Sequence, residues 1–362
     1  KFGIGFKAVY VYTNTPEIHS GKFDFRIENV IVPNNEDVPK TAKANLTQFI
    51  FPFDNPNKSA KIAVKEIIED GFEKLDETSL LFLTHIKTIR YCQPDGGAGY
   101  VSIENKISNI YFICAITVKK PNSEKIVTYW AKFSDNCPIM VSSNDSRNKT
   151  IKAFPVSIAY RLNKNENNFS LDSSLMGKVC LFFPTEMDSL LHFHINAPFA
   201  STVARDVILS AGEDGEANTK LIRKLADLTA ESLHWFKKAK MLDYAAYSTL
   251  PALRDYDNQP NSRYKMFATR IKTEFENSEL FITETCTYCA LTAALRASKD
   301  IKTVLPAQNI ENLYGKYWIP TFLPANFSTD KERRLANFIM QFSVAEYTIE
   351  DFINSLETDN TL

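Results

Sequence analysis

Hydrophobic and polar positions follow two different patterns along the chain, and the pattern changes near residue 210. Before it, short apolar stretches predict strands at 23–27, 48–53, 110–118, 126–133, 156–162 and 178–183, the first with clear period-2 alternation. After it, apolar residues recur every three or four positions. This spacing predicts helices from 216 onward and at 262–278, 284–298, 331–343 and 348–356. The chain is therefore expected to have an α+β fold, with strands first and helices last.

Smaller features refine this outline. Residues 58–75 have helical spacing ahead of the strand-rich part, and 80–91 form an apolar segment. The polar stretch 30–43 contains two prolines and is expected to be a loop, and 95–99 is a glycine-rich turn. The strands at 110–118 and 126–133 flank a short polar segment, which predicts a hairpin.

Composition narrows the function classes. The chain has 362 residues, of which 44% are hydrophobic and 23% charged, so a largely disordered protein is excluded and two or three domains are expected. The net charge is −1, and basic residues are not interleaved with the aromatic ones, which argues against a nucleic-acid partner. The longest apolar run, 110–118, is too short for a membrane helix.

Cysteine and histidine offer two candidate sites. Six sparse cysteines suggest reduced thiols in a cytoplasmic protein. Cys286 and Cys289 form a C-x-x-C, but no second pair completes a zinc site and no βαβ unit surrounds it, so packing is favoured over thioredoxin-like chemistry. His192 and His194 share one strand face, where a structural role is favoured over a metal site.

The sharpest motif stands at residues 2–10, FGIGFKAVY. Gly3 and Gly5 precede a run that is compatible with a helix. Glycine lets a backbone approach an anion closely, and the amide groups that open a helix favour negative charge, so this is a candidate phosphate cradle. It matches neither the P-loop nor the dinucleotide fingerprint. The alternative is a helix-entry loop whose glycines serve packing.

The flanking residues sharpen the interpretation. Residues 2–10 resemble the last glycine box of the GHKL ATPases, the Bergerat-fold group of gyrase, heat-shock chaperones, histidine kinases and MutL, in which a G-x-x-G-x-G-F loop forms the ATP lid. Segments 13–21, 46–52, 80–89, 182–186 and 193–199, with Arg205, are similar in order to motifs of the sacsin/No-vein-type branch. The resemblance covers residues 1–210.

This resemblance implies a domain organisation. Residues 1–98 would be the C-terminal part of a Bergerat ATP-binding domain, 99–212 an α+β middle domain, and 213–362 a mainly helical extension. The family's catalytic glutamate, Mg²⁺-binding asparagine and adenine-binding aspartate lie upstream of the glycine loop. The chain is therefore expected to be an N-terminally truncated piece that by itself binds ATP weakly or not at all.

The resemblance also implies site residues. The lid residues would meet the triphosphate of ATP, and Thr47 would hold adenine through a water, although Leu46 stands where the family has glycine. Arg205 would offer its charge to the γ-phosphate, or else forms a surface salt bridge with Asp206. The lid residues are Gly3, Ile4, Gly5 and Phe6.

The expected function is nucleotide-driven coupling between an ATP site and a middle domain, with ATP and Mg²⁺ as cofactors and slow hydrolysis. The purpose would be chaperone-like or defence-related, and the helical region could hold a protein client. The alternative is a non-catalytic interaction scaffold with a degenerate Bergerat fold. Either protein is expected to be cytoplasmic, without a membrane partner.

Overall fold

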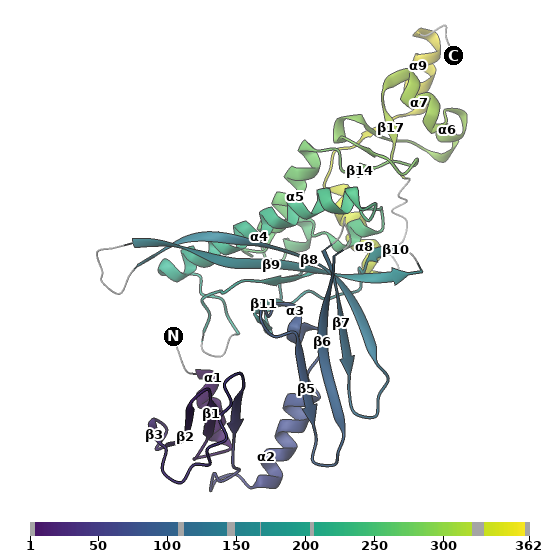
Figure 1. Cartoon of the computed structure of the whole chain (residues 1–362). Coiled ribbons are helices and arrows are strands. Elements are labelled where there is room, and N and C mark those ends of the chain that lie inside the picture. The colour runs from purple at the N-terminus through teal and green to yellow at the C-terminus, as the bar shows by residue number, and fades with distance from the viewer. Residues whose placement is uncertain are drawn as a thin grey trace. The chain divides into compact units, whose positions relative to one another are not determined.

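The computed structural model describes residues 4–107, 112–142, 149–166, 168–202, 206–320 and 329–358. It is a mixed α+β structure with 33% helix and 29% strand, which confirms the expected fold class. The chain forms two compact units (Figure 1). One consists of residues 1–76, 90–99 and 120–123, and the other of 77–89, 100–119 and 124–362. The three expected domains, with boundaries at 98/99 and 212/213, do not coincide with these two units, and that division stays a prediction.

The first unit is built on a four-stranded antiparallel sheet of order β3-β2-β1-β4. Strand β2 confirms the strand expected at 23–27. The strand expected at 48–53 is confirmed only in its first half, because β4 ends at Ile50. The expected loop 30–43 is wrong in part, because residues 32–34 pair with β2 as a short edge strand. The strands are β1 (Glu17–Ser20), β2 (Phe23–Glu28), β3 (Val32–Asn34) and β4 (Thr47–Ile50).

Helical segments complete the first unit. Helix α1 (Ile4–Lys7) tightens at once into the 3₁₀-helix η1 (Ala8–Val11). Helix α2 (Ala60–Glu66) begins after Ser59, whose hydroxyl accepts a hydrogen bond from the Ile62 amide, and continues as the π-helical turn η2 (Ile67–Phe72). The helix expected at 58–75 is therefore confirmed, with its second half more widely wound.

The second unit contains most of a nine-stranded sheet with the order β12-β11-β13-β9-β8-β7-β6-β5, in which β10 also pairs with β9. The expected hairpin is confirmed, since Val118 pairs with Ile126; residues 110 and 111 lie outside the described part. The strands are β5 (Thr88–Cys92), β6 (Ala98–Ile107), β7 (Phe112–Lys119), β8 (Ile126–Ser142), β9 (Lys149–Asn165), β10 (Asn168–Leu171), β11 (Val179–Leu181), β12 (Phe183–Pro184) and β13 (His194–Asn196).

Strands β8 and β9 are 17 residues long and extend as a ribbon beyond their described pairing with other strands. The pairing of β7 with β8 ends at Ala131, and the pairing of β13 with β9 ends at Ser157. The ribbon is the part of β8 after Ala131 together with the part of β9 before Ser157. It contains two prolines, Pro138 opposite Ala153 and Pro155 opposite Asn136. Proline is tolerated where its missing amide faces away from the ladder.

Helix α4 (Gly212–Lys238) covers one face of this ribbon and sheet (Figure 1). Its apolar face is buried, and Phe236 packs between Phe133 and Tyr160. Helices α5 (Lys265–Asn277) and α8 (Asp330–Met340) confirm two further expectations, and the 3₁₀-helices η3 (Ala246–Thr249) and η4 (Leu253–Tyr256) lie between α4 and α5. One hydrophobic cluster joins these helices to the sheet. No helix among the described residues is long and apolar enough to cross a membrane.

The helix expected at 284–298 is wrong. This segment holds β15 (Tyr288–Cys289), which pairs with β14 (Phe281–Ile282), then the 3₁₀-turn η5 (Leu291–Ala293) and β16 (Ala294–Arg296). The hydroxyls of Thr283 and Thr287 lie 2.8 Å apart, and Cys286 has a φ of +58°, so the local bonds favour a tight turn.

The last part of the chain forms a smaller cluster around Trp318. Strand β16 is flanked by β17 (Tyr317–Trp318) and β18 (Ala345–Glu346) in a parallel sheet. Helix α9 (Ile349–Thr358) confirms the expectation near 348–356, whereas α6 (Lys299–Val304) and α7 (Ala307–Tyr314) were not expected.

Candidate functional site

The glycine motif opens a short helix. Gly3 lies outside the described residues, and Ile4 and Gly5 begin α1. In place of one continuous α-helix after the glycines, the structure has one α-helical turn, α1, followed by one 3₁₀ turn, η1. Tyr10 and Val11 are held by Asn55, whose Nδ2 lies 2.9 Å from the Tyr10 carbonyl oxygen.

Phe6 connects this helix to strand β4. Its ring centroid lies 6.2 Å from that of Phe49 and 6.4 Å from that of Phe51. Thr47 is two residues before Phe49, so the two side chains share one face of the strand. The structure therefore brings Phe6 onto the same face of the sheet as Thr47. The Thr47 hydroxyl lies 2.7 Å from that of Ser20.

A cavity of about 300 Å³ lies beside the 3₁₀-helix η1. Its lining is apolar and comes from three segments of the first unit. Lys58 lies at 4.7 Å from the ring centroid of Tyr12 and pairs with Glu66 at 2.5 Å. Burial raises the pKa of Tyr12, and its hydrogen bond with Glu66 adds to this. The lining residues are Ala8, Val9, Tyr12, Phe51, Phe53 and Ile67.

Asp54 holds the loop before β1 in place, a role that was not expected from the sequence. Its Oδ1 accepts hydrogen bonds from the Thr13 hydroxyl at 3.1 Å and the Asn14 amide at 2.6 Å, while Oδ2 accepts from the Thr15 hydroxyl. Burial alone would raise the pKa of Asp54, but these hydrogen bonds outweigh it and hold the pKa below its usual value. The signal available in the sequence was the T-x-T segment, whose hydroxyls and amides suit a carboxylate.

A second buried polar group lies across β1 and β2. His19 is 1% exposed, and its Nδ1 lies 2.7 Å from Oδ1 of Asp24. This bond, with those from the backbone amides of Ala42 and Thr41, lowers the pKa of Asp24 against the effect of burial. Glu17, beside His19, accepts two hydrogen bonds from Arg26. No group of three metal-ligating side chains is found among the described residues.

The other residues singled out from the sequence lie in the second unit. Arg205 is outside the described residues, so its role stays a prediction; the neighbouring Asp206 accepts a hydrogen bond from the Thr202 hydroxyl. His192 Nδ1 lies 2.7 Å from the Leu175 carbonyl oxygen. His194 accepts a hydrogen bond from the Lys178 amide and stacks on Trp130. These contacts are consistent with a structural role for both histidine rings.

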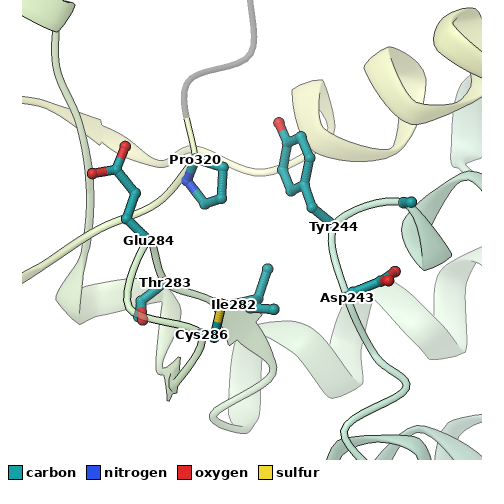
Figure 2. A pocket seen from close by; sticks show the side chains of 8 residues that line it. Asp243, Tyr244, Ile282, Thr283, Glu284, Cys286 and Pro320 are labelled. Carbon is teal, nitrogen blue, oxygen red and sulfur yellow. The ribbon is translucent and has the colours of Figure 1, made fainter. Parts of the chain in front are cut away.

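The C-x-x-C places its two thiols in different surroundings. Cys286 is exposed, whereas Cys289 is buried in β15, where burial raises its pKa to about 11. All six cysteines are free thiols. A second cavity, of about 480 Å³, opens next to Cys286 (Figure 2). It involves none of the residues that the glycine motif brings together.

Of the predicted ATP-site residues, Phe6 and Thr47 lie on the same face of the sheet. Gly3 and Arg205 lie outside the described residues. Comparison of the chain with known protein families and with curated proteins found no match.

Proposed function

We propose that the first unit supplies the lid and the adenine-facing strand of a GHKL-type ATP site. The observation that carries this proposal is the packing of Phe6 on the face of β4 that holds Thr47, 6.2 Å from Phe49 between ring centroids. Two segments that are 40 residues apart in the sequence, each with a motif of this family, thereby meet on one surface.

Each residue has a defined role in this proposal. The backbone amides from Gly3 to Phe6 would bind the triphosphate, because glycine leaves room for an anion. Phe49 is 51% exposed beside Phe6, which leaves an aromatic surface for a purine base, and Thr47 would reach that base through a water. Mg²⁺ would neutralise charge on the phosphates.

The proposed activity is ATP hydrolysis that drives a conformational change. Arg205 would place its guanidinium at the γ-phosphate and stabilise charge that develops there. The middle α+β region would respond to the nucleotide, and the helical region would hold a client protein. This suits a chaperone-like or defence-related protein of the cytoplasm.

One observation favours a second candidate function, a scaffold that binds proteins and no nucleotide. Several large apolar side chains of the first unit are exposed, including Phe23 at 69%, Ile31 at 80% and Leu46 at 55%. Exposed apolar surface of this kind is typical of protein interaction sites.

Labelled ATP distinguishes the two functions. We would titrate it with Mg²⁺ against the natural full-length protein and its Gly5→Val variant, with Gly71→Ala as the matched control. A methyl group on Gly71 would meet no atom within 4 Å. The ATPase proposal expects at least about tenfold weaker binding for Gly5→Val, because its side chain would block the close approach of a phosphate, and unchanged binding for the control. Equal affinities for Gly5→Val and the unaltered protein would refute the phosphate role, and no binding by the unaltered protein at millimolar ATP would favour the scaffold.

A further inference from the structure

The cavity of about 300 Å³ in the first unit is lined by residues that the proposed ATP site does not use. Its lining begins at Ala8, two residues after Phe6, and does not include Thr47. Two of the lining residues, Ala8 and Phe51, are exposed, so a ligand can enter from solvent. The cavity is therefore a site of its own, which does not depend on the proposed function.

Polar contacts outside the cavity hold its walls together. Asn55 Nδ2 donates to the Tyr10 carbonyl oxygen at 2.9 Å, which ties the segment after β4 to η1. The Tyr12 side chain is hydrogen-bonded to Glu66, the last residue of α2, which directly precedes the lining residue Ile67. The three wall segments are thus joined to one another without a ligand, as is usual for small-molecule sites.

Among the residues that the structure describes, the lining contains no charged side chain. Its one polar side chain, Tyr12, is hydrogen-bonded to Glu66, and the Glu66 carboxylate pairs with Lys58 at 2.5 Å. Asp70, which also acts on Tyr12, pairs with Lys74 at 2.7 Å. A charged ligand would lose hydration in this cavity without gaining an unpaired group of opposite charge.

The volume and the wall side chains set the size and shape of a ligand. An apolar cavity of about 150 Å³ in another protein holds one benzene molecule, and this cavity has about twice that volume. Two fused rings therefore match it better than one. Three of the wall side chains are aromatic, namely Tyr12, Phe51 and Phe53, and they can pack edge-to-face against a flat ring system.

The wall that contains Ile67 is an unusual helical turn. Ile67 begins the π-helical turn η2, in which the Glu73 amide donates to the Ile68 carbonyl oxygen, five residues earlier, at 3.0 Å. Turns of this kind are rare and occur frequently at functional sites. Its position at the cavity is consistent with a binding role for this wall.

We propose that this cavity binds a small neutral aromatic molecule with two fused rings. The rings would pack against Tyr12, Phe51 and Phe53, and the aliphatic side chains of Val9 and Ile67 would complete the contact. Burial of apolar surface supplies the affinity. The absence of an unpaired charge in the described lining selects against charged molecules of the same shape.

Methyl NMR spectroscopy of the whole chain tests this proposal. Indole would be titrated, without ATP, against protein with ¹³C-labelled valine and isoleucine methyl groups. The signals of the lining residues would be identified by their loss in Val9→Ala and Ile67→Leu. We expect saturable shifts of both signals with a Kd of about 1 mM or lower, and an unchanged signal for Ile31, which is exposed in the same unit.

Two other two-ring compounds test the chemistry of the ligand. Indole-3-carboxylate adds a charge to the same ring system, and adenine has polar groups around its edge that the lining does not match. Neither is expected to shift the Val9 and Ile67 signals at concentrations that saturate them with indole. Equal shifts by either compound would overturn the proposal, as would the absence of saturable shifts with indole.

A variant that fills the cavity tests its location. Ala8→Leu is expected to weaken indole binding at least about fivefold, because the larger side chain occupies part of the space and removes buried contact area. Ala60→Leu is the matched control, since Ala60 is exposed at the start of α2 and lies outside the lining. Equal affinities of the two variants for indole would place the ligand elsewhere and overturn the proposal.

Discussion

At the scale of single residues, two glycines are required by contacts with the backbone of other segments. A Cβ on Gly177 would lie 2.2 Å from the Phe193 carbonyl oxygen and 2.5 Å from that of Leu191. A Cβ on Gly215, in the first turn of α4, would lie 2.3 Å from the carbonyl carbon of Ser210. Backbone atoms cannot move aside as the ends of flexible side chains can, so a side chain at either position would force the backbone to shift.

Gly177→Ala is therefore expected to lower the free energy of unfolding by about 2 kcal/mol or more. Urea denaturation followed by tryptophan fluorescence would measure it. Gly315→Asn is the control, because Gly315 ends α7 with a φ of +60° and open space around it, and asparagine tolerates that conformation at a cost below about 1 kcal/mol. Equal losses for the two variants would contradict the steric explanation.

The Asp54 carboxylate should make the first unit sensitive to acid. Its pKa in the folded protein lies below the unfolded value of about 3.9, so its stabilisation is complete above that value and is lost as the pH falls through the folded pKa. We expect the protection of the Asn14 amide against hydrogen exchange, relative to its intrinsic rate, to fall about fivefold over that range.

Two variants identify the carboxylate responsible. Asp54→Asn should show no such step, because its amide does not titrate. Asp37→Asn, in an exposed loop of the same unit, should retain the step. A step that persists in Asp54→Asn would assign the acid sensitivity to another group.

At the scale of elements, the sequence predicted correctly those helices that bury a single apolar face. Helices α5 and α8 follow from apolar spacing because each buries a single face, with Phe267 and Phe338 fully enclosed. The segment around Cys286 was mistaken for a helix because apolar spacing does not reveal hydroxyl contacts such as that between Thr283 and Thr287. Edge strand β3 was missed because three residues with a proline carry no period.

The same limit applies to the candidate site. Local motifs singled out Phe6 and Thr47, whose shared surface the fold then provided. Asp54 lies about 40 residues from the hydroxyls that it binds, and His19 meets Asp24 only across the turn between β1 and β2. Pairings of this kind are set by strand register, which motif spacing along the chain does not contain.

Helix α8 begins with a capping box that the sequence displays. The Thr329 hydroxyl accepts from the Glu332 amide at 3.2 Å, and the Glu332 carboxylate accepts from the Thr329 amide at 3.0 Å. Thr329→Ala is expected to cost about 1 kcal/mol in urea denaturation. Thr273→Ala, at an exposed position inside α5, should be neutral or slightly stabilising, since alanine favours helix. A cost for Thr273→Ala as large as that for Thr329→Ala would contradict the capping role.

At the scale of the whole molecule, the second of the two compact units holds every tryptophan. Trp130 and Trp318 are buried, and Trp235 packs against Phe133. The chain has three tryptophans, so fluorescence reports on the second unit alone, whereas far-ultraviolet circular dichroism reports on both.

Ile18→Ala, in the sheet of the first unit, is expected to destabilise that unit by about 2–4 kcal/mol and to leave the fluorescence midpoint in urea unchanged. The dichroism curve should gain an earlier transition. Phe267→Ala, buried in the second unit, should instead shift the fluorescence midpoint. An equal shift of fluorescence for both variants would mean that the chain unfolds as a single cooperative structure.

The prolines of the β8–β9 ribbon have a consequence for behaviour in concentrated solution. A long two-stranded ribbon presents unpaired backbone groups along its rims and can add strands from other molecules, which is how fibrillar aggregates grow. Pro138 and Pro155 place an amide-free position on each strand, so an incoming chain would find an interrupted row of donors. The ribbon can thus remain long and accessible, with Met140 and Ile151 exposed, while resisting polymerisation through its rims.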